Sequence, residues 1–160
     1  MMKRNWVFAV LFAACSFPSC KNAGKKTFRV NLSYSNADKL ALANPGFPGS
    51  ESTWVYLEEI VYGRDQAPVL VDSAKLKGTI GNIELSGKAG KEGIYEVVIG
   101  ENALAIPLIN DVPVVRMRAD LAKKTDFYTI TESDASKQLQ DLLHSVAEKN
   151  REVELSFNRL

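Results

Sequence analysis

The feature that most constrains the fold is a two-residue alternation of apolar and polar side chains. It is clearest in TFRVNLSYS, residues 27–35. The apolar members of this segment are Phe28, Val30, Leu32 and Tyr34. Successive side chains of a strand point to opposite faces of its sheet, so this spacing predicts a half-buried antiparallel strand.

Seven further segments of similar character follow, about one every dozen residues. They cover residues 53–63, 67–76, 81–89, 93–100, 103–110, 112–119 and 126–131. Val, Ile and aromatic residues are frequent within them, and Gly, Pro, Asn and Asp lie between them, most densely in the loop 37–52. Short strands at such regular spacing predict a mainly β fold, an antiparallel β-sandwich or open barrel of about 7–8 strands within residues 27–132.

After Thr131 the apolar residues recur at a spacing of three and four. They are Leu139, Leu142, Leu143, Val146, Val153, Phe157 and Leu160. This stripe predicts a C-terminal amphipathic helix in residues 133–160, with Ser133 or Asp134 capping its first turn. Asn150 interrupts the stripe, so we expect a break there. Residues 133–149 would then dock on the sheet, and residues 150–160 would be mobile in the monomer or buried only in a homodimer or against a partner protein.

The first 19 residues have the layout of a signal peptide. Lys3 and Arg4 form a basic start, and residues 6–14 are an uninterrupted run of nine apolar residues. This run is too short to cross a bilayer, which takes about 20 residues. Cys20 follows a small residue in what resembles a loose lipobox. We therefore predict a lipoprotein signal peptide in residues 1–19 and lipidation at Cys20.

Two other uses of the cysteines stay open. Cys15 follows two alanines and could be lipidated instead, which would leave an apolar region of about seven residues, the lower limit for a leader. A disulfide between Cys15 and Cys20 would require the leader to be retained, and its spacing is neither CxxC nor that of a zinc site. With Cys20 as the anchor, residues 20–26 become a tether. The tether lacks acidic residues, which favours a position in the cell envelope on the outer membrane, facing the periplasm.

The charge balance of the mature chain gives no sign of a charged partner. Without Lys3 and Arg4 the chain has 18 basic and 19 acidic residues, a formal charge of −1. A nucleic-acid-binding domain normally carries a basic face, so we predict no nucleic-acid partner. No cysteine follows Cys20, and no nucleophile motif or metal-ligand spacing is recognisable. We predict no catalytic residue, no metal site and no cofactor.

Four titratable residues have both a structural and a functional interpretation. Asp72 ends an apolar segment, where a carboxylate most often accepts backbone N–H groups of a turn. Glu58 and Glu59 are adjacent in a strand and point to opposite faces, whereas an acid/base pair must face one cleft. His144 is the single histidine, and a solvated histidine on a helix is far commoner than a metal ligand there.

Glycines and aromatic residues carry the remaining candidate features. Gly78, Gly81 and Gly87 are expected in turns with positive φ or in a bulge, because no spacing matches a phosphate loop. Trp54 and Tyr56 share one strand face, which is core in most proteins but can also form a platform for stacking a sugar, and Tyr62 could extend that platform. Arg116 and Arg118 share a face of their strand, which we expect to be exposed.

One long run of the sequence resembles a known domain family. The run VLVDSAKLKGTIGNIELSGKAGKEGIYEVVI, residues 69–99, carries Asp72-Ser73, Gly78, Ile83 to Gly87 and Tyr95 in the family's order. It resembles an uncharacterised N-terminal β domain of lipid-anchored, periplasmic thiol-disulfide oxidoreductases of the thioredoxin-like, TlpA/AhpC-related group. The resemblance covers about residues 27–132 and continues through IPLINDVPVVRMRAD and YTITESDASKQLQDL. The sequence departs from the family at residues 80–83, where the turn is longer, and at 131–133, where a glycine is missing.

The resemblance implies a lipid-anchored, non-catalytic envelope domain that positions a redox module, dimerises or binds a partner protein. The family's redox activity belongs to its CxxC-bearing thioredoxin part, and this sequence contains no CxxC. The alternative is a free-standing envelope lipoprotein that binds a glycan or a peptide through the loop 37–52 and the aromatic residues of the sandwich.

Overall fold

The computed structural model describes residues 27–40, 53–63, 66–88, 90–100, 104–123 and 125–157. Its eight strands are β1 (Thr27–Ser35), β2 (Trp54–Glu59), β3 (Val69–Lys75), β4 (Gly81–Lys88), β5 (Ile94–Ile99), β6 (Leu104–Ile109), β7 (Val114–Asp120) and β8 (Tyr128–Ile130). A short 3-10 helix, η1 (Ala37–Lys39), follows β1, and the long helix α2 (Asp134–Phe157) follows β8. The predicted lipidation residue, Cys20, and most of the loop 37–52 lie outside the described residues.

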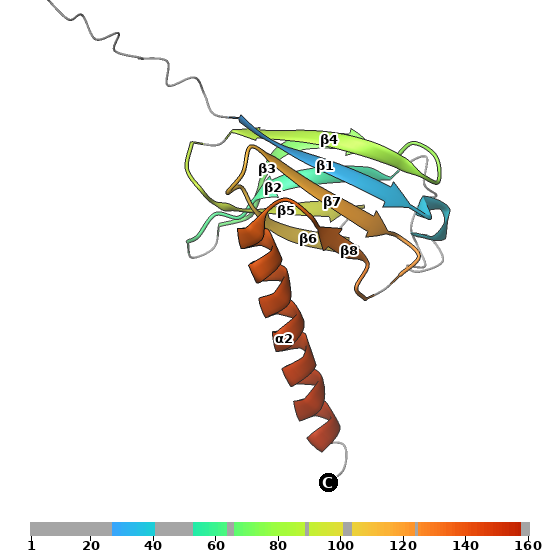
Figure 1. Cartoon of the computed structure of the whole chain (residues 1–160), viewed down its shortest axis with the longest axis vertical. Helices are drawn as coiled ribbons and strands as arrows, with labels where there is room; N and C mark the ends of the chain where they lie inside the picture. The colour runs from blue at the N-terminus through green and yellow to red at the C-terminus, as the bar shows by residue number, and fades with distance from the viewer. Residues whose placement is uncertain are drawn as a thin grey trace, which may run out of the picture.

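The strands form two four-stranded sheets, with the orders β4-β1-β7-β8 and β3-β2-β5-β6. Figure 1 shows the two sheets as the layers of an open sandwich and α2 extending away from them. The mainly β fold with a C-terminal helix is thus confirmed. Neighbouring strands are antiparallel except for β1 and β7, which run parallel with Asn31 opposite Arg116.

The core lies between the sheets and follows the alternation of the sequence. Phe28, Val30, Leu32 and Tyr34 of β1 are all buried, as the two-residue spacing predicts. Their counterparts in the other sheet include Leu57 and further Val, Ile and Leu side chains that are fully buried. Burying each such side chain stabilises the fold by about 1.5–3 kcal/mol, so this layer is what holds the two sheets together.

Two of the glycines have a role that the sequence analysis did not predict. Gly78 has φ +71° and fits the expected turn. Gly81 and Gly87 instead sit in β4 directly opposite Tyr34 and Phe28 of β1. Aromatic rings occupy the space that a Cβ would need, with the Oη of Tyr34 at 2.5 Å from the Cβ position of Gly81. The prediction of positive φ was therefore wrong for these two, because the cross-strand register rather than a turn requires glycine.

Asp72 links the two sheets through backbone N–H groups. Its Oδ1 accepts from the N–H of Ser73 and its Oδ2 from the N–H of Ser86, both at 2.8 Å. Ser86 belongs to β4 of the other sheet, and β3 is irregular next to Asp72, where the register shifts between Leu57 and Glu58. The predicted acceptor role is confirmed, but in mid-strand and across the open edge of the sandwich rather than in a turn.

Helix α2 is one continuous helix through Asn150, so the predicted break there was wrong. An exposed helix interior tolerates Asn at a cost of only about 0.7 kcal/mol, which neighbouring helical residues easily outweigh. The docked part is also shorter than predicted. Leu139 is half-buried, but every residue from Asp141 to Phe157 is exposed.

Hydrogen bonds anchor the first turns of α2 to the end of the sandwich. Ser133 caps the helix, because its Oγ accepts from the N–H of Ser136 at 2.9 Å and donates to Asp111 at 2.5 Å. The Oγ of Ser136 in turn accepts from the N–H of Ile109 in the edge strand β6 at 2.8 Å. Further along, Gln140 donates to the backbone oxygen of Tyr128 at 3.0 Å. Polar contacts, rather than the apolar stripe, therefore fix the direction of the helix.

Candidate functional site

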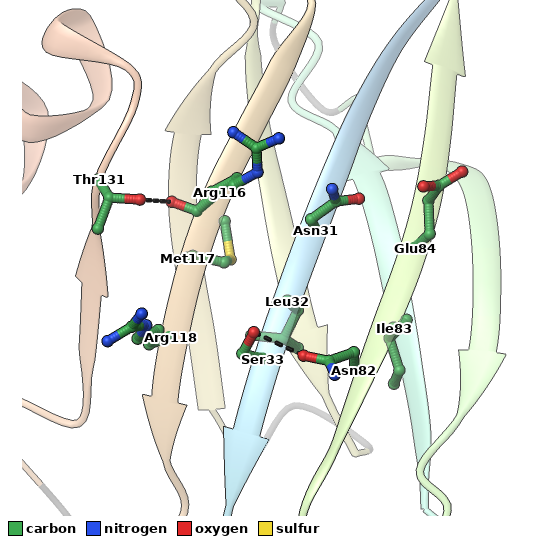
Figure 2. A pocket seen from close by; sticks show the side chains of 10 residues that line it. All are labelled: Asn31, Leu32, Ser33, Asn82, Ile83, Glu84, Arg116, Met117, Arg118 and Thr131. Carbon is green, nitrogen blue, oxygen red and sulfur yellow. Dashed lines mark hydrogen bonds between the residues drawn. The ribbon is translucent and has the colours of Figure 1, made fainter.

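The outer face of the β4-β1-β7-β8 sheet carries a shallow polar trough. Figure 2 shows its side chains on three neighbouring strands and on the segment after β8. Register places them in two rows across the sheet. One row runs from Glu84 through Asn31 to Arg116, and the other runs from Asn82 through Ser33 to Arg118. The two rows are about 7 Å apart, because a strand rises about 3.3–3.4 Å per residue.

The hollow exists because β1, the middle strand of the three, carries shorter side chains than the neighbouring strand β7. Asn31 and Ser33 of β1 form the floor, and the long side chains of Arg116 and Arg118 form one wall. The resulting volume is about 400 Å³, within the range of small-molecule sites. Thr131 closes one end and holds its position by two hydrogen bonds to the backbone oxygen of Arg116, from its N–H at 2.9 Å and its Oγ1 at 3.2 Å.

The charges around the trough are mostly paired, with one exception. Arg116 forms an ion pair with Glu132, and Arg29 lies 3.7 Å from Glu84. Arg118 makes no ion pair or side-chain hydrogen bond with another described residue. On the floor, the buried Oδ1 of Asn31 has no hydrogen-bond partner among the described residues. A free guanidinium beside amide and hydroxyl groups suits a ligand with a carboxylate and further polar groups.

The predicted aromatic pair lies on the outer face of the other sheet. The rings of Trp54 and Tyr56 are nearly parallel, with centroids 6.5 Å apart and 19° between their planes. Lys75 places its Nζ 4.9 Å from the centroid of Trp54. Trp54 is 40% exposed, so it is a surface residue rather than part of the core. Tyr62 is exposed in the connection that follows β2.

Two carboxylates meet on that same face. Glu58 and Glu59 do point to opposite sides of β2, as predicted, but Glu58 lies directly opposite Glu96 of β5. Burial raises the pKa of Glu96, and repulsion from the nearby Glu58 adds to this rise. The sequence analysis missed this pair because it depends on which strand lies next to β2.

The single histidine lies at the edge of the docked part of α2. His144 places its Nε2 3.3 Å from Asp126, in the connection between β7 and β8. Within the described ranges, no group of three or more His, Cys, Asp or Glu side chains is arranged to hold a metal ion. His144 and Asp126 thus form a polar contact at the surface between the helix and the sandwich. Among the same residues, no helix has the length and apolar character that crossing a bilayer requires.

A search of protein-family models, curated proteins and solved structures finds no match to this chain. The resemblance to the N-terminal domain of periplasmic oxidoreductases therefore stays a prediction.

The exposed half of α2 is the second candidate site. Its large apolar residues are Leu142, Leu143, Val146, Val153, Leu155 and Phe157, all at least 41% exposed. Spacings of three and four place all of them except Leu155 on one side of the helix, where they form an apolar stripe, and Leu155 lies on the opposite side. The sequence analysis identified this stripe correctly but placed its first half against the sheet. Periodicity shows which residues share a face, and the contacts of Ser136 and Gln140 determine which face meets the sandwich.

Proposed function

We propose that this protein is a lipid-anchored, non-catalytic domain of the cell envelope that works through contact with another protein chain. In this proposal Cys20 carries the lipid, the sandwich is a rigid support, and α2 is the contact element. The outer membrane facing the periplasm is the proposed location. The resemblance to the accessory domain of periplasmic oxidoreductases supports the same role.

One observation carries the proposal: the sandwich holds a long helix whose apolar stripe faces solvent. Leu142 is 59% exposed and Phe157 is 70% exposed. Exposing several large apolar side chains in one stripe is unfavourable by about 25 cal/mol for each Å² left in water. Contiguous apolar surface of this kind marks sites of protein or membrane contact.

The lipid anchor is tested in cells that make the full chain. We expect incorporation of a palmitate analogue and recovery in the membrane fraction, and we expect Cys20→Ala to lose both. Cys15→Ala is the matched control and should keep the label, because Cys15 would be removed with the leader. Label that persists in Cys20→Ala and disappears in Cys15→Ala would move the anchor to Cys15. A full chain that is unlabelled and soluble would refute the proposed anchoring.

The non-catalytic role is tested with the membrane-extracted full chain in an insulin-reduction assay. Thiol-disulfide exchange needs a thiolate, and lipidation would block the thiol of Cys20. We expect no reduction above the level of an extract from cells without the protein. Turnover that scales with the amount of the chain in independent preparations would contradict the proposal.

The polar trough favours a second candidate function, a free-standing lipoprotein that binds a glycan or a peptide. Arg118 supplies a cation without an ion-pair partner among the described residues, and the side chains of Asn31 and Ser33 lie in the same hollow, with the Oγ of Ser33 donating to Asn82 at 2.6 Å. An acidic oligosaccharide such as a trimer of galacturonate is a suitable probe, with maltotriose as the neutral comparison. Shifts of the NMR signals of β1 and β7 with the acidic probe alone, lost in Arg118→Ala and kept in Arg151→Ala, would support this function. Equal responses to both probes, or none, would refute the binding of acidic glycans in the trough.

A further inference from the structure

The apolar stripe of α2 does not face the domain that carries it. Ser136, Gln140 and His144 each contact the sandwich, and they follow one another at intervals of four along one side of the helix. At about 100° per residue, Val146 and Val153 lie roughly a third of a turn away from that side. The stripe is therefore open to a second chain along its whole length while the helix stays docked.

Four residues of the stripe are placed symmetrically about its midpoint, whereas the counterpart of Leu143 is Ser156. Val146 and Val153 are equally far from the point between Lys149 and Asn150, and so are Leu142 and Phe157. In two antiparallel copies of the helix, each Val146 would meet a Val153 and each Leu142 would meet a Phe157. A parallel arrangement would also place apolar residues together, but only the antiparallel one uses this symmetry and keeps the two sandwiches apart at opposite ends.

The centre of the stripe contains a polar residue that can pair with its own copy across a two-fold axis. Asn150 is the single polar residue within the stripe, and in helix pairs one buried Asn fixes register and orientation at some cost in stability. Two copies related by a two-fold axis would place their Asn150 amides next to each other, where each can donate to and accept from the other. Lys149 lies at the edge, and its Nζ is 2.8 Å from Glu152 of the same helix. Its charge is thus balanced without a partner.

We infer that the partner of α2 is a second copy of this chain, packed antiparallel through Leu142–Phe157 around a two-fold axis between Lys149 and Asn150. Such an interface is isologous and closes on itself, so it gives a dimer rather than a fibre. The paired segment is about 22 Å long at 1.5 Å per residue. This inference rests on the proposed function, in which α2 is a contact element, and it names the partner.

The inference is tested by cysteine cross-linking of the full chain in cell membranes. Asn150→Cys places a thiol beside the proposed axis. Glu148→Cys is the matched control on the opposite side of the helix. Phe157→Cys lies within the stripe but far from the axis, so the same position in a second copy would be about 22 Å away. All three positions are exposed, and Glu148 lies beside the groove between α2 and the sandwich, away from the stripe. The natural chain, without an added cysteine, gives the background.

After oxidation with copper phenanthroline, we expect a disulfide dimer of Asn150→Cys at least about tenfold above background, because association raises the local thiol concentration to the millimolar range. Glu148→Cys and Phe157→Cys should stay near background. A dimer of Phe157→Cys would indicate parallel packing and overturn the inference. A disulfide-dimer yield of Asn150→Cys no higher than that of Glu148→Cys would also overturn the inference. Fractionation of the same cells reports the lipid anchor separately, so a membrane-bound chain that does not cross-link refutes the pairing alone.

Discussion

Replacing Gly87 by alanine should force the core apart at one identifiable place. Gly87 lies opposite Phe28 in the pairing of β4 with β1. An added Cβ would come within 2.2 Å of Cε1 and 2.8 Å of Cζ of the Phe28 ring. The ring cannot easily turn aside, because Phe28 is 1% exposed and its centroid is 4.6 Å from that of Tyr95. Either the ring or the strand must therefore move.

The expected loss of stability in Gly87→Ala is the difference between two opposing effects. Overpacking a well-packed core costs about 1–3 kcal/mol, and a contact this short belongs at the upper end. Replacing Gly by Ala also reduces the conformational entropy of the unfolded chain, which stabilises the folded protein by about 0.4–1 kcal/mol. We expect Gly87→Ala to lower the free energy of unfolding by about 2 kcal/mol, measured by urea denaturation of the detergent-extracted chain.

Two comparisons make this prediction refutable. Gly90→Ala is the matched control, since nothing lies within 4 Å of the Cβ position of Gly90, and it should leave stability unchanged or slightly higher. Phe28→Leu removes part of the ring, so the loss caused by Gly87→Ala should be smaller in that background. If Gly87→Ala unfolds at the same urea concentration as Gly90→Ala, the aromatic contact does not explain this glycine.

Three further substitutions test separate contacts. Glu96→Gln should raise the free energy of unfolding at neutral pH by about 0.5 kcal/mol, because like charges directly opposite on a sheet are destabilising. The pKa of Glu96 is raised in the folded protein, so the ionised carboxylate destabilises the fold as pH rises above 4.5. The stability gained by Glu96→Gln should therefore vanish below that pH. Urea denaturation at several pH values measures this dependence. Ser133→Ala should cost about 1 kcal/mol through loss of the helix cap and should reduce the helical circular dichroism signal. Asp72→Asn should cost about 1 kcal/mol, because an amide presents only one acceptor oxygen to the N–H groups of Ser73 and Ser86, and faster hydrogen exchange at Ser86 would report that loss.

The fold class was predictable because it depends on local periodicity. The alternation in residues 27–35 specifies which side chains of β1 are buried, and the change of spacing after Thr131 specifies α2. Local patterns do not show the order of the strands within each sheet. The sequence predicts a turn or a bulge at Gly87, because nothing in it shows that Phe28 lies across from this residue.

The same limit explains the outcome for the candidate sites. The shared face of Arg116 and Arg118 was predictable from their spacing, and both are exposed as expected. Their neighbours Asn31 and Glu84 come from strands far away in sequence, so the polar trough was not predictable. For α2, the stripe was predictable but its surroundings were not, because the docking side is determined by the contacts of single polar residues such as Ser136.

Sedimentation equilibrium tests most directly the claim that α2 is a contact element paired with a second copy. The full chain is measured in a density-matched nonionic detergent and compared with Val146→Asp, which places a charge in the middle of the stripe. Glu148→Asp serves as the control on the opposite side of the helix. The account predicts a dimer for the natural chain and for Glu148→Asp, and a monomer for Val146→Asp. A natural chain that stays monomeric at every concentration, or a Val146→Asp variant that remains a dimer, would contradict it.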